Sequence, residues 1–292
     1  MPTRQYRPKT PAARIITMLL MTALAVLSGC AGPKKIGPQQ DDLFGARAYK
    51  HFLDGDIPRA IEVYKRAYEA ARKIDNGAGA ARHLSNIGRA YYELLRADSA
   101  ALYFAKAYEE FKVYGNDAGI LKSAAFLALC NASAGDNASA QRWLGAASSA
   151  NSDKKTRKDN ERYLSVIKGM VDFRLTSKVS NERELSDALA FYKKKKDHTV
   201  LSTVYRLMAD VEFTKGNCST AVRYLDYALL SIDESKEKYK RSAVLLKLAA
   251  IKFCAGDEAA GKHYYERAAG CAPKGAPAPV MEQVRSCGGV CR

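Results

Sequence analysis

The chain of 292 residues is 47% hydrophobic and carries a formal net charge of +16. That apolar content is ample for a buried core, which excludes a chain too polar to fold, and the length suits either two ordinary domains or one elongated array. Composition does not choose between these organisations, so the order of the elements along the chain has to decide.

The first 29 residues have the layout of a secretory signal. A positive region precedes an apolar run over 15–27, and its cations are Arg4, Arg7, Lys9 and Arg14. This order is typical of export. This run of 13 residues would span about 20 Å as a helix, less than the ~30 Å hydrocarbon core of a bilayer. We therefore predict a signal peptide over 1–29 rather than a permanent transmembrane anchor.

The sequence Leu27-Ser28-Gly29-Cys30 follows the apolar run and resembles the lipobox of bacterial lipoproteins. The resemblance implies that Cys30 is acylated and becomes the mature N-terminus, and attachment by two or more acyl chains is effectively stable. Ala31 follows the cysteine, which in enteric bacteria resembles a signal for the outer membrane. We expect a lipid-anchored protein of the bacterial cell envelope, facing the periplasm. The alternative is a buried cysteine in an ordinary first helix.

Residues 30–42 are expected to form a flexible tether that carries the lipid at its first residue. The segment has few apolar residues and contains turn and loop formers, namely Gly32, Pro33, Gly37 and Pro38. Such a composition is typical of a linker.

A three-residue unit recurs beyond the tether: a small residue, a bulky residue four positions later, and an alanine three positions further on. Its clear copies are Ala60, Tyr64, Ala67; Ala100, Phe104, Ala107; Ala140, Leu144, Ala147; Ala221, Leu225, Ala228; and Gly261, Tyr265, Ala268. These copies begin 40 residues apart, or 81 apart where a weaker copy with Ala188, Tyr192 and Lys195 intervenes. Spacings of four and three place the unit on one helical face, so each copy predicts one helix packed closely on another.

Turn residues precede most copies, and a second amphipathic helix lies further upstream. The turns are Gly55-Asp56, Gly135-Asp136, Gly216-Asn217 and Gly256-Asp257; glycine tolerates left-handed backbone, and Asp or Asn caps the next helix. The repeat is therefore helix, tight turn, helix, then a connector of several residues. Because such units bury their apolar faces only by stacking, we predict an all-α, right-handed α-solenoid of about six helix-turn-helix repeats.

The second unit resembles the signature of the tetratricopeptide repeat family. The matching residues are Leu84, Ile87, Gly88, Tyr91, Ala100, Phe104 and Ala107, and Pro273 stands where a closing proline is expected. The resemblance covers residues 43–272 and leaves 273–292 as a Pro- and Cys-containing tail. The interval of 40 exceeds the family's usual ~34, which implies longer linkers or extended helices. Residues 150–200 depart most from the pattern, so a kink or a boundary between two subarrays is expected there.

Proteins of this family often grip peptides on the concave surface lined by the first helix of each pair. Projection of the helices places seven residues on or near that surface: Tyr49, Arg82, Arg89, Tyr92, Arg206, Phe213 and Phe253. Arg and Tyr are frequent at binding hot spots. The alternative is that the aromatic residues are core and the arginines are merely solvated.

Seven cysteines are present, and assigning Cys30 to lipid leaves six. An even number in an oxidising periplasm indicates disulfides. The first candidate pair is Cys218 with Cys254, near the turns of adjacent units. Cys287 and Cys291 could close a small loop, or one of them could reach Cys271. Cys130 is a candidate core residue, and a metal site is the sharper but disfavoured alternative for the C-terminal cysteines, because no histidine lies nearby.

Two basic clusters stand out: one is Lys154, Lys155, Arg157 and Lys158, and the other is 193–196. They are either solvated helix ends or contacts for an acidic partner, such as anionic lipid, lipopolysaccharide, a cell-wall polymer or an acidic protein face. Export argues against a nucleic acid. The four dispersed histidines and the lack of a Gly-rich phosphate loop or nucleophile elbow predict no metal, no cofactor and no catalysis.

The sequence therefore favours an adaptor in the assembly or positioning of a cell-envelope complex, of the pilus, secretion or outer-membrane assembly type. This choice rests on fold analogy. A regulator of a cell-wall enzyme, or a cell-wall-binding protein, is the second hypothesis. A hydrolase hidden in the irregular region 150–200 is the third.

Overall fold

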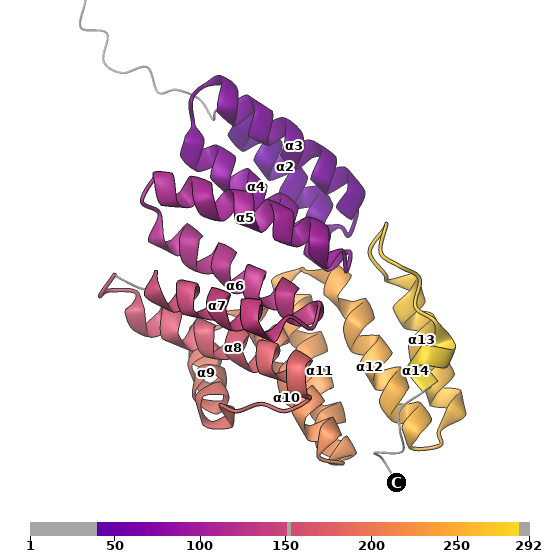
Figure 1. The fold of residues 1–292 in the computed structure, drawn as a ribbon. Helices are drawn as coiled ribbons and strands as arrows, with labels where there is room; N and C mark the ends of the chain where they lie inside the picture. Colours follow the sequence, from indigo (N-terminus) through magenta and orange to yellow (C-terminus); the bar gives the residue numbers. More distant parts are fainter. Residues whose placement is uncertain (1–39, 151–152, 286–292) are drawn as a thin grey trace, which may run out of the picture. The chain divides into compact units, whose positions relative to one another are not determined.

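The structure, a computed structural model, describes residues 40–150 and 153–285 (Figure 1). The expected signal peptide, Cys30, Cys287 and Cys291 lie outside these residues. The chain from Gln40 onward forms a compact unit of its own. In the described part, its helices are α2 Gln40–Leu53, α3 Ile57–Lys73, α4 Gly77–Glu93, α5 Ala97–Val113, α6 Asp117–Ser133, α7 Asn137–Ser149, α8 Arg157–Thr176, α9 Glu182–Lys195, α10 His198–Thr214, α11 Cys218–Ser235, the 3-10 helix η1 Lys238–Lys240, α12 Arg241–Cys254, α13 Glu258–Gly270 and α14 Met281–Arg285.

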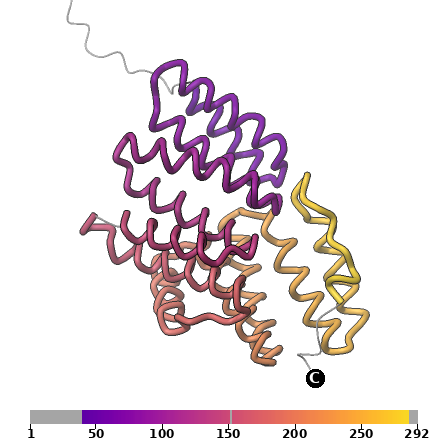
Figure 2. The backbone as a smooth tube through the Cα atoms, in the orientation of Figure 1, coloured from indigo at the N-terminus to yellow at the C-terminus, as the bar shows by residue number. Residues whose placement is uncertain are grey.

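Consecutive helices pack in pairs along the chain, from α2 with α3 to α12 with α13 (Figures 1 and 2). This arrangement confirms the predicted all-α array of helix-turn-helix repeats. The small residues of the recurring unit lie at the helix contacts: Ala60, Ala100, Ala140 and Ala221 are fully buried. A side chain larger than alanine at these positions would hold the neighbouring helix away.

The 40-residue interval comes from long helices rather than long linkers. Helices α3, α4, α5 and α6 each contain 17 residues, and three residues separate each of them from the next helix. The connector between repeats is thus as tight as the turn within a repeat, which corrects the expected connector of several residues. Turn glycines fit this geometry, since Gly55 and Gly135 adopt φ values of +77° and +78°, where a Cβ would be strained.

Helix α6 is mostly apolar, without a distinct polar face, and lies between other helices. It packs against α5, α7 and α8, and its buried residues include Leu121, Leu127 and Leu129. A helix with no polar face is stable in water only when neighbours surround it. This helix is therefore enclosed by helices of the second, third and fourth repeats.

The regular spacing breaks after α7, within the region that departs from the repeat pattern. Seven residues, 150–156, separate α7 from α8, and α8 extends to 20 residues. Ser177 then ends α8 in a left-handed conformation. The expected register returns in α9, where Ala188 and Tyr192 are buried.

Both predicted ends of the array shift. Helix α2 begins at Gln40, and Asp41 is fully buried, so residues 40–42 belong to the first repeat rather than to the tether. At the other end, Ala276 packs against a core cluster formed by the first two repeats. The beginning of the expected tail is thus part of the fold. Among the described residues, no helix is both long and apolar enough to cross a membrane.

Candidate partner-binding surface

Arg89, expected to meet a partner, is instead bound by the chain itself. Its Nη2 atom lies 2.6 Å from Glu237 Oε1 and donates a hydrogen bond to the Tyr239 hydroxyl at 3.1 Å. Burial alone would lower the pKa of Arg89, but the neighbouring Tyr239 and Glu237 outweigh it and raise that pKa above its ordinary value. Arg89 is therefore already paired within the chain, and its contact with a partner stays a prediction.

Three other predicted residues lie on the first two repeats and differ in their exposure and in their contacts within the chain. Tyr49 is 47% exposed, and Arg82 is also exposed while donating a hydrogen bond to Asp42 at 2.9 Å. Tyr92 packs edge-on against Phe126 and accepts a hydrogen bond from Arg174. Partner contact through Tyr49, Arg82 and Tyr92 stays a prediction.

The predicted residues of the later repeats are less accessible. Phe253 is only 8% exposed and covers Gly261, where an added Cβ would lie 2.4 Å from its ring. Its role as a partner contact is corrected to that of a core residue. Phe213 is partly buried against the core of α9–α12, with the Lys247 ammonium 5.8 Å from its ring centre. Arg206 is half-buried, and its role in binding stays a prediction.

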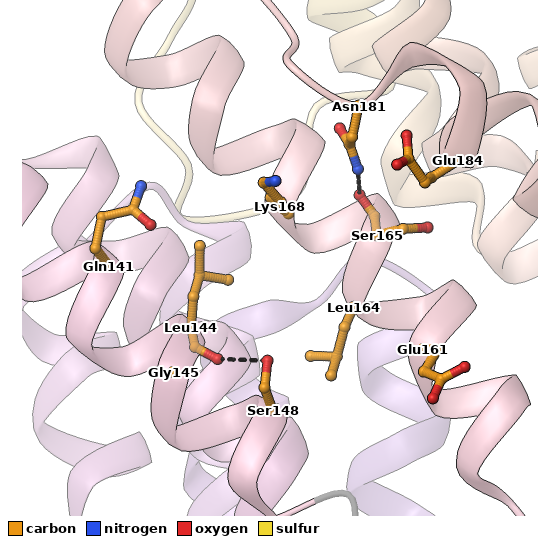
Figure 3. Close-up of a pocket in the computed structure, with 10 residues that line it drawn as sticks. All are labelled: Gln141, Leu144, Gly145, Ser148, Glu161, Leu164, Ser165, Lys168, Asn181 and Glu184. Carbon is orange, nitrogen blue, oxygen red and sulfur yellow. Dashed lines mark hydrogen bonds between the residues drawn. The ribbon is translucent and has the colours of Figure 1, made fainter.

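The sequence reasoning missed an open groove where the regular stacking breaks. This groove has a volume of about 580 Å³ and lies between α7 and the α8–α9 pair (Figure 3). We call it the α7–α8 groove. The residues that line it are Gln141, Leu144, Gly145 and Ser148 from α7, Glu161, Leu164, Ser165 and Lys168 from α8, and Asn181 and Glu184 at the start of α9.

The groove lies where α7 lacks the bulky side chain that α3, α5 and α11 have at the equivalent position. Eight residues after the small residue of the repeat unit stand Tyr68, Tyr108 and Leu229, and each packs into an apolar cluster. The equivalent position in α7 is Ser148. A hydroxymethyl group cannot fill the space that a phenol fills elsewhere, so the contact between α7 and the next repeat stays open.

The groove combines an apolar lining with exposed charged residues, a combination that suits a polypeptide ligand. Leu144 and Leu164 supply the apolar lining, whereas Glu161, Lys168 and Glu184 are exposed. A partner can therefore bury an apolar anchor while its polar groups meet charges and amides at the edge.

Two polar side chains of the groove are held by local hydrogen bonds. The Ser148 hydroxyl donates to the Leu144 carbonyl at 3.0 Å, and Asn181 Nδ2 donates to the Ser165 carbonyl at 2.8 Å (Figure 3). The second bond fixes the orientation of the Asn181 amide and leaves its buried Oδ1 without a hydrogen-bond partner. The groove thus has a fixed polar wall at the start of α9.

The cysteines of the described residues fall into two groups. Cys218 and Cys254 are both disulfide-bonded, which fits the expectation of disulfides in the last repeats, and their bonding to each other stays a prediction. Cys130 and Cys271 are free thiols, so the alternative in which a C-terminal cysteine reaches Cys271 is not formed in the structure. Burial raises the pKa of Cys130 to about 12, and this buried thiol acts as a small core residue.

The basic clusters lie on the surface. Lys154, Lys155, Arg157 and Lys158 are exposed on the connector before α8 and in its first turn, and the lysines of 193–196 are exposed at the end of α9. Part of the second cluster is used within the molecule, since Lys195 Nζ lies 2.9 Å from Asp159 Oδ2. Among the described residues, no group of three or more potential ligands could hold a metal ion.

Comparison with known families supports the repeat assignment for the first part of the array. The tetratricopeptide repeat family matches residues 45–112, which extend from α2 to α5. These two helix pairs are similar to tetratricopeptide repeats, a class whose members bind other proteins. No curated protein matches the chain.

Proposed function

We propose that this protein is a lipid-anchored adaptor that binds another cell-envelope protein through the α7–α8 groove. The lipobox-like sequence ending at Cys30 supports the anchor. The match to tetratricopeptide repeats supports protein binding. The role is the assembly or positioning of an envelope complex, with the array as a non-catalytic scaffold.

The proposal rests mainly on Ser148, a small residue in the groove wall at the position where the first two repeats have tyrosine. Tyr68 and Tyr108 close the contacts between the first three repeats, whereas Ser148 leaves an open volume of about 580 Å³. An open contact forfeits burial worth about 25 cal/mol per Å² of apolar surface. A partner that inserts an apolar side chain between Leu144 and Leu164 recovers that burial.

The groove fits an extended or helical segment with one apolar anchor and charges of both signs. Lys168 can pair with a carboxylate of the partner, and Glu161 or Glu184 can pair with its cations. Such edge charges steer association and fix register more than they add affinity. The apolar anchor between the two leucines is expected to supply most of the binding energy.

The test is to close the groove with the tyrosine that the first two repeats carry at the equivalent position. The lipidated protein is purified from its own envelope after mild cross-linking, as wild type and as Ser148→Tyr. Because the phenol fills the space between α7 and α8, the variant should recover at least about tenfold less partner, which corresponds to ~1.4 kcal/mol of binding.

Ser149→Tyr is the matched control, because Ser149 is exposed on the same helix and does not line the groove. It should recover the partner as the wild type does. Equal recovery by Ser148→Tyr and Ser149→Tyr would exclude the groove as the binding site. If the wild type itself recovers no defined protein, the adaptor function fails.

The exposed basic cluster before α8 favours a second candidate function, a cell-wall-binding regulator. Its cations are Lys154, Lys155, Arg157 and Lys158, and exposed cations bind anionic polymers in a salt-dependent way. Purified peptidoglycan should then retain the protein at low salt and release it at high salt. Replacing the four cations with Gln should abolish retention, and retention that ignores this change would exclude the cluster.

A further inference from the structure

A short segment from the second half of the array lies on the first two repeats. This segment, residues 237–240 between α11 and α12, is called the latch here. Tyr239 belongs to a core cluster formed with residues of α2, α3 and α4. Its ring stands edge-on to Phe52, with the ring centres 4.8 Å apart. The latch therefore occupies a surface of the repeats that match the tetratricopeptide family.

The contact with the latch is specific in geometry. Arg89 of α4 stacks over the Phe52 ring at 4.9 Å and pairs with Glu237 at 2.6 Å. The Tyr239 hydroxyl also donates to Glu237 Oε1 at 3.0 Å. Arg89 and Phe52, with the turn at Gly55 beside them, thus form a receptor for a carboxylate followed two residues later by an aromatic ring. A Cβ built on Gly55 would lie in van der Waals contact with Tyr239, at 3.6 Å.

The centre of this contact is ionic. Glu237 is 2% exposed and pairs with both Arg89 and Lys240, the latter at 2.7 Å. Burial alone would raise the pKa of Glu237, but the cations of Lys240 and Arg89 hold it below its ordinary value. Burial lowers the pKa of Lys240. Buried ion pairs contribute little net stability compared with apolar packing, because both ions lose hydration.

An ionic contact of this kind differs from the cores of the repeats. The charges of Glu237, Arg89 and Lys240 are hydrated again when the two surfaces separate, although the Tyr239 ring also leaves its apolar cluster. Beside the latch, the Lys274 amide donates to the Gly55 carbonyl at 2.9 Å, and Lys274 Nζ lies 3.2 Å from Asp56 Oδ2. The latch thus combines an ionic centre, whose charges gain hydration on separation, with a single aromatic anchor, Tyr239.

We propose that residues 237–240 are a built-in ligand of the first two repeats, and that a partner segment with a carboxylate two residues before an aromatic ring displaces them. The receptor is Phe52, Gly55 and Arg89. In the closed form the chain competes with the partner at the high effective concentration of an intramolecular ligand. This second interaction surface is separate from the α7–α8 groove and does not depend on the lipid anchor.

The test uses the compact unit from Gln40 onward and a fluorescent peptide with the sequence of residues 235–241. The double variant Glu237→Gln/Tyr239→Ala removes the side chains that fill the receptor. It should bind the peptide at least tenfold more tightly than the wild-type unit does, measured by fluorescence anisotropy. Equal affinity for wild type and double variant would overturn the proposal.

Two controls distinguish specific binding at the receptor from non-specific binding of the peptide. Lys238→Ala changes an exposed latch residue and should bind the peptide as weakly as the wild type. A peptide with Gln for the glutamate and Ala for the tyrosine should not bind the double variant. Binding of this altered peptide with equal affinity would overturn the recognition of a carboxylate and a ring.

A second measurement covers the case in which the double variant loses its helical circular dichroism. Hydrogen exchange is then measured on the wild-type unit with and without a large excess of the peptide. Displacement should accelerate exchange in residues 237–240 and leave α4 protected. Unchanged exchange in the latch at saturating peptide would overturn the proposal.

Discussion

Two contacts between neighbouring repeats differ in how their space is filled. Where α5 of the second repeat meets the third, Phe104 is fully buried and stacks on Phe126 at 4.7 Å, and Tyr108 stands edge-on to Trp143 at 5.2 Å. Where α7 meets the fourth repeat, Ser148 leaves the α7–α8 groove open. One contact is thus a closed core and the other an open groove, and the groove coincides both with the small side chain of Ser148 and with the longer connector before α8.

The largest expected effect comes from emptying the closed contact. Phe104→Ala should lower the free energy of unfolding by about 3–5 kcal/mol, because a fully buried ring is lost and its cavity cannot collapse among packed helices. Chemical denaturation of the unit from Gln40 onward measures this.

Leu144→Ala is the matched variant at the equivalent position of α7. Leu144 is half-buried and borders the groove, so its loss creates little new cavity and should cost about 1 kcal/mol. Similar costs for the two variants would contradict the view that only one of these contacts is closed.

Acid should loosen the contact between the first and second repeats, where α4 contributes a buried histidine that faces α2. His83 is 2% exposed, and burial lowers its pKa to about 4, helped by Arg82 and opposed by Asp41. The folded state then binds a proton less readily than the unfolded state, so stability is complete above pH ~6.5 and falls as the pH drops toward ~4, by roughly 3 kcal/mol in total.

Unfolding measured from pH 7 to pH 4 tests this dependence. His83→Gln should remove the corresponding part of the pH profile, since glutamine does not titrate. His263→Gln, at an exposed position of α13, should leave the profile unchanged. A wild-type profile that His83→Gln does not alter would show that another group causes the acid loss.

The next change converts the closed contact into a second groove. Tyr108→Ser places the α7 residue type at the equivalent position of α5. The loss of a half-buried ring that packs on Trp143 should cost about 2 kcal/mol. Exchange of the amides around Trp143 should accelerate together with this loss. If stability changes by less than about 0.5 kcal/mol, Tyr108 does not close the contact.

The repeat plan was predictable because it depends on local spacing. Small and bulky residues recur at fixed intervals, and the fully buried Ala60, Ala100 and Ala140 confirm the face that the spacing indicated. An alignment of the repeats could also have indicated the α7–α8 groove, since Ser148 stands where the first two repeats have Tyr68 and Tyr108. It was missed because only the first three members of the unit were compared.

The fate of Arg89 could not be predicted from spacing. Its partner Glu237 lies 148 residues away along the chain, and no periodic pattern indicates that the segment between α11 and α12 reaches the first repeats. Projection of a helix likewise identifies the residues of one face, but not the helix that packs on that face. Phe253 was therefore assigned to the concave surface, whereas it packs on Gly261. Long-range contacts of this kind depend on the curvature accumulated over many repeats.

The smallest effects are expected from two glycines, one at the closed contact between the second and third repeats and one in the α7–α8 groove. Gly119 lies under the Phe111 ring, and a Cβ there would come within 2.5 Å of the ring, whereas a Cβ on Gly145 meets nothing within 4 Å. Gly119→Ala should therefore destabilise the protein by about 1 kcal/mol, because overpacking outweighs the gain in helix propensity. Gly145→Ala should stabilise it by up to about 1 kcal/mol, because only the propensity term acts in the open groove. Denaturation midpoints that shift in opposite directions would support the contrast, and a loss of stability in Gly145→Ala would mean that the groove is packed more tightly in solution.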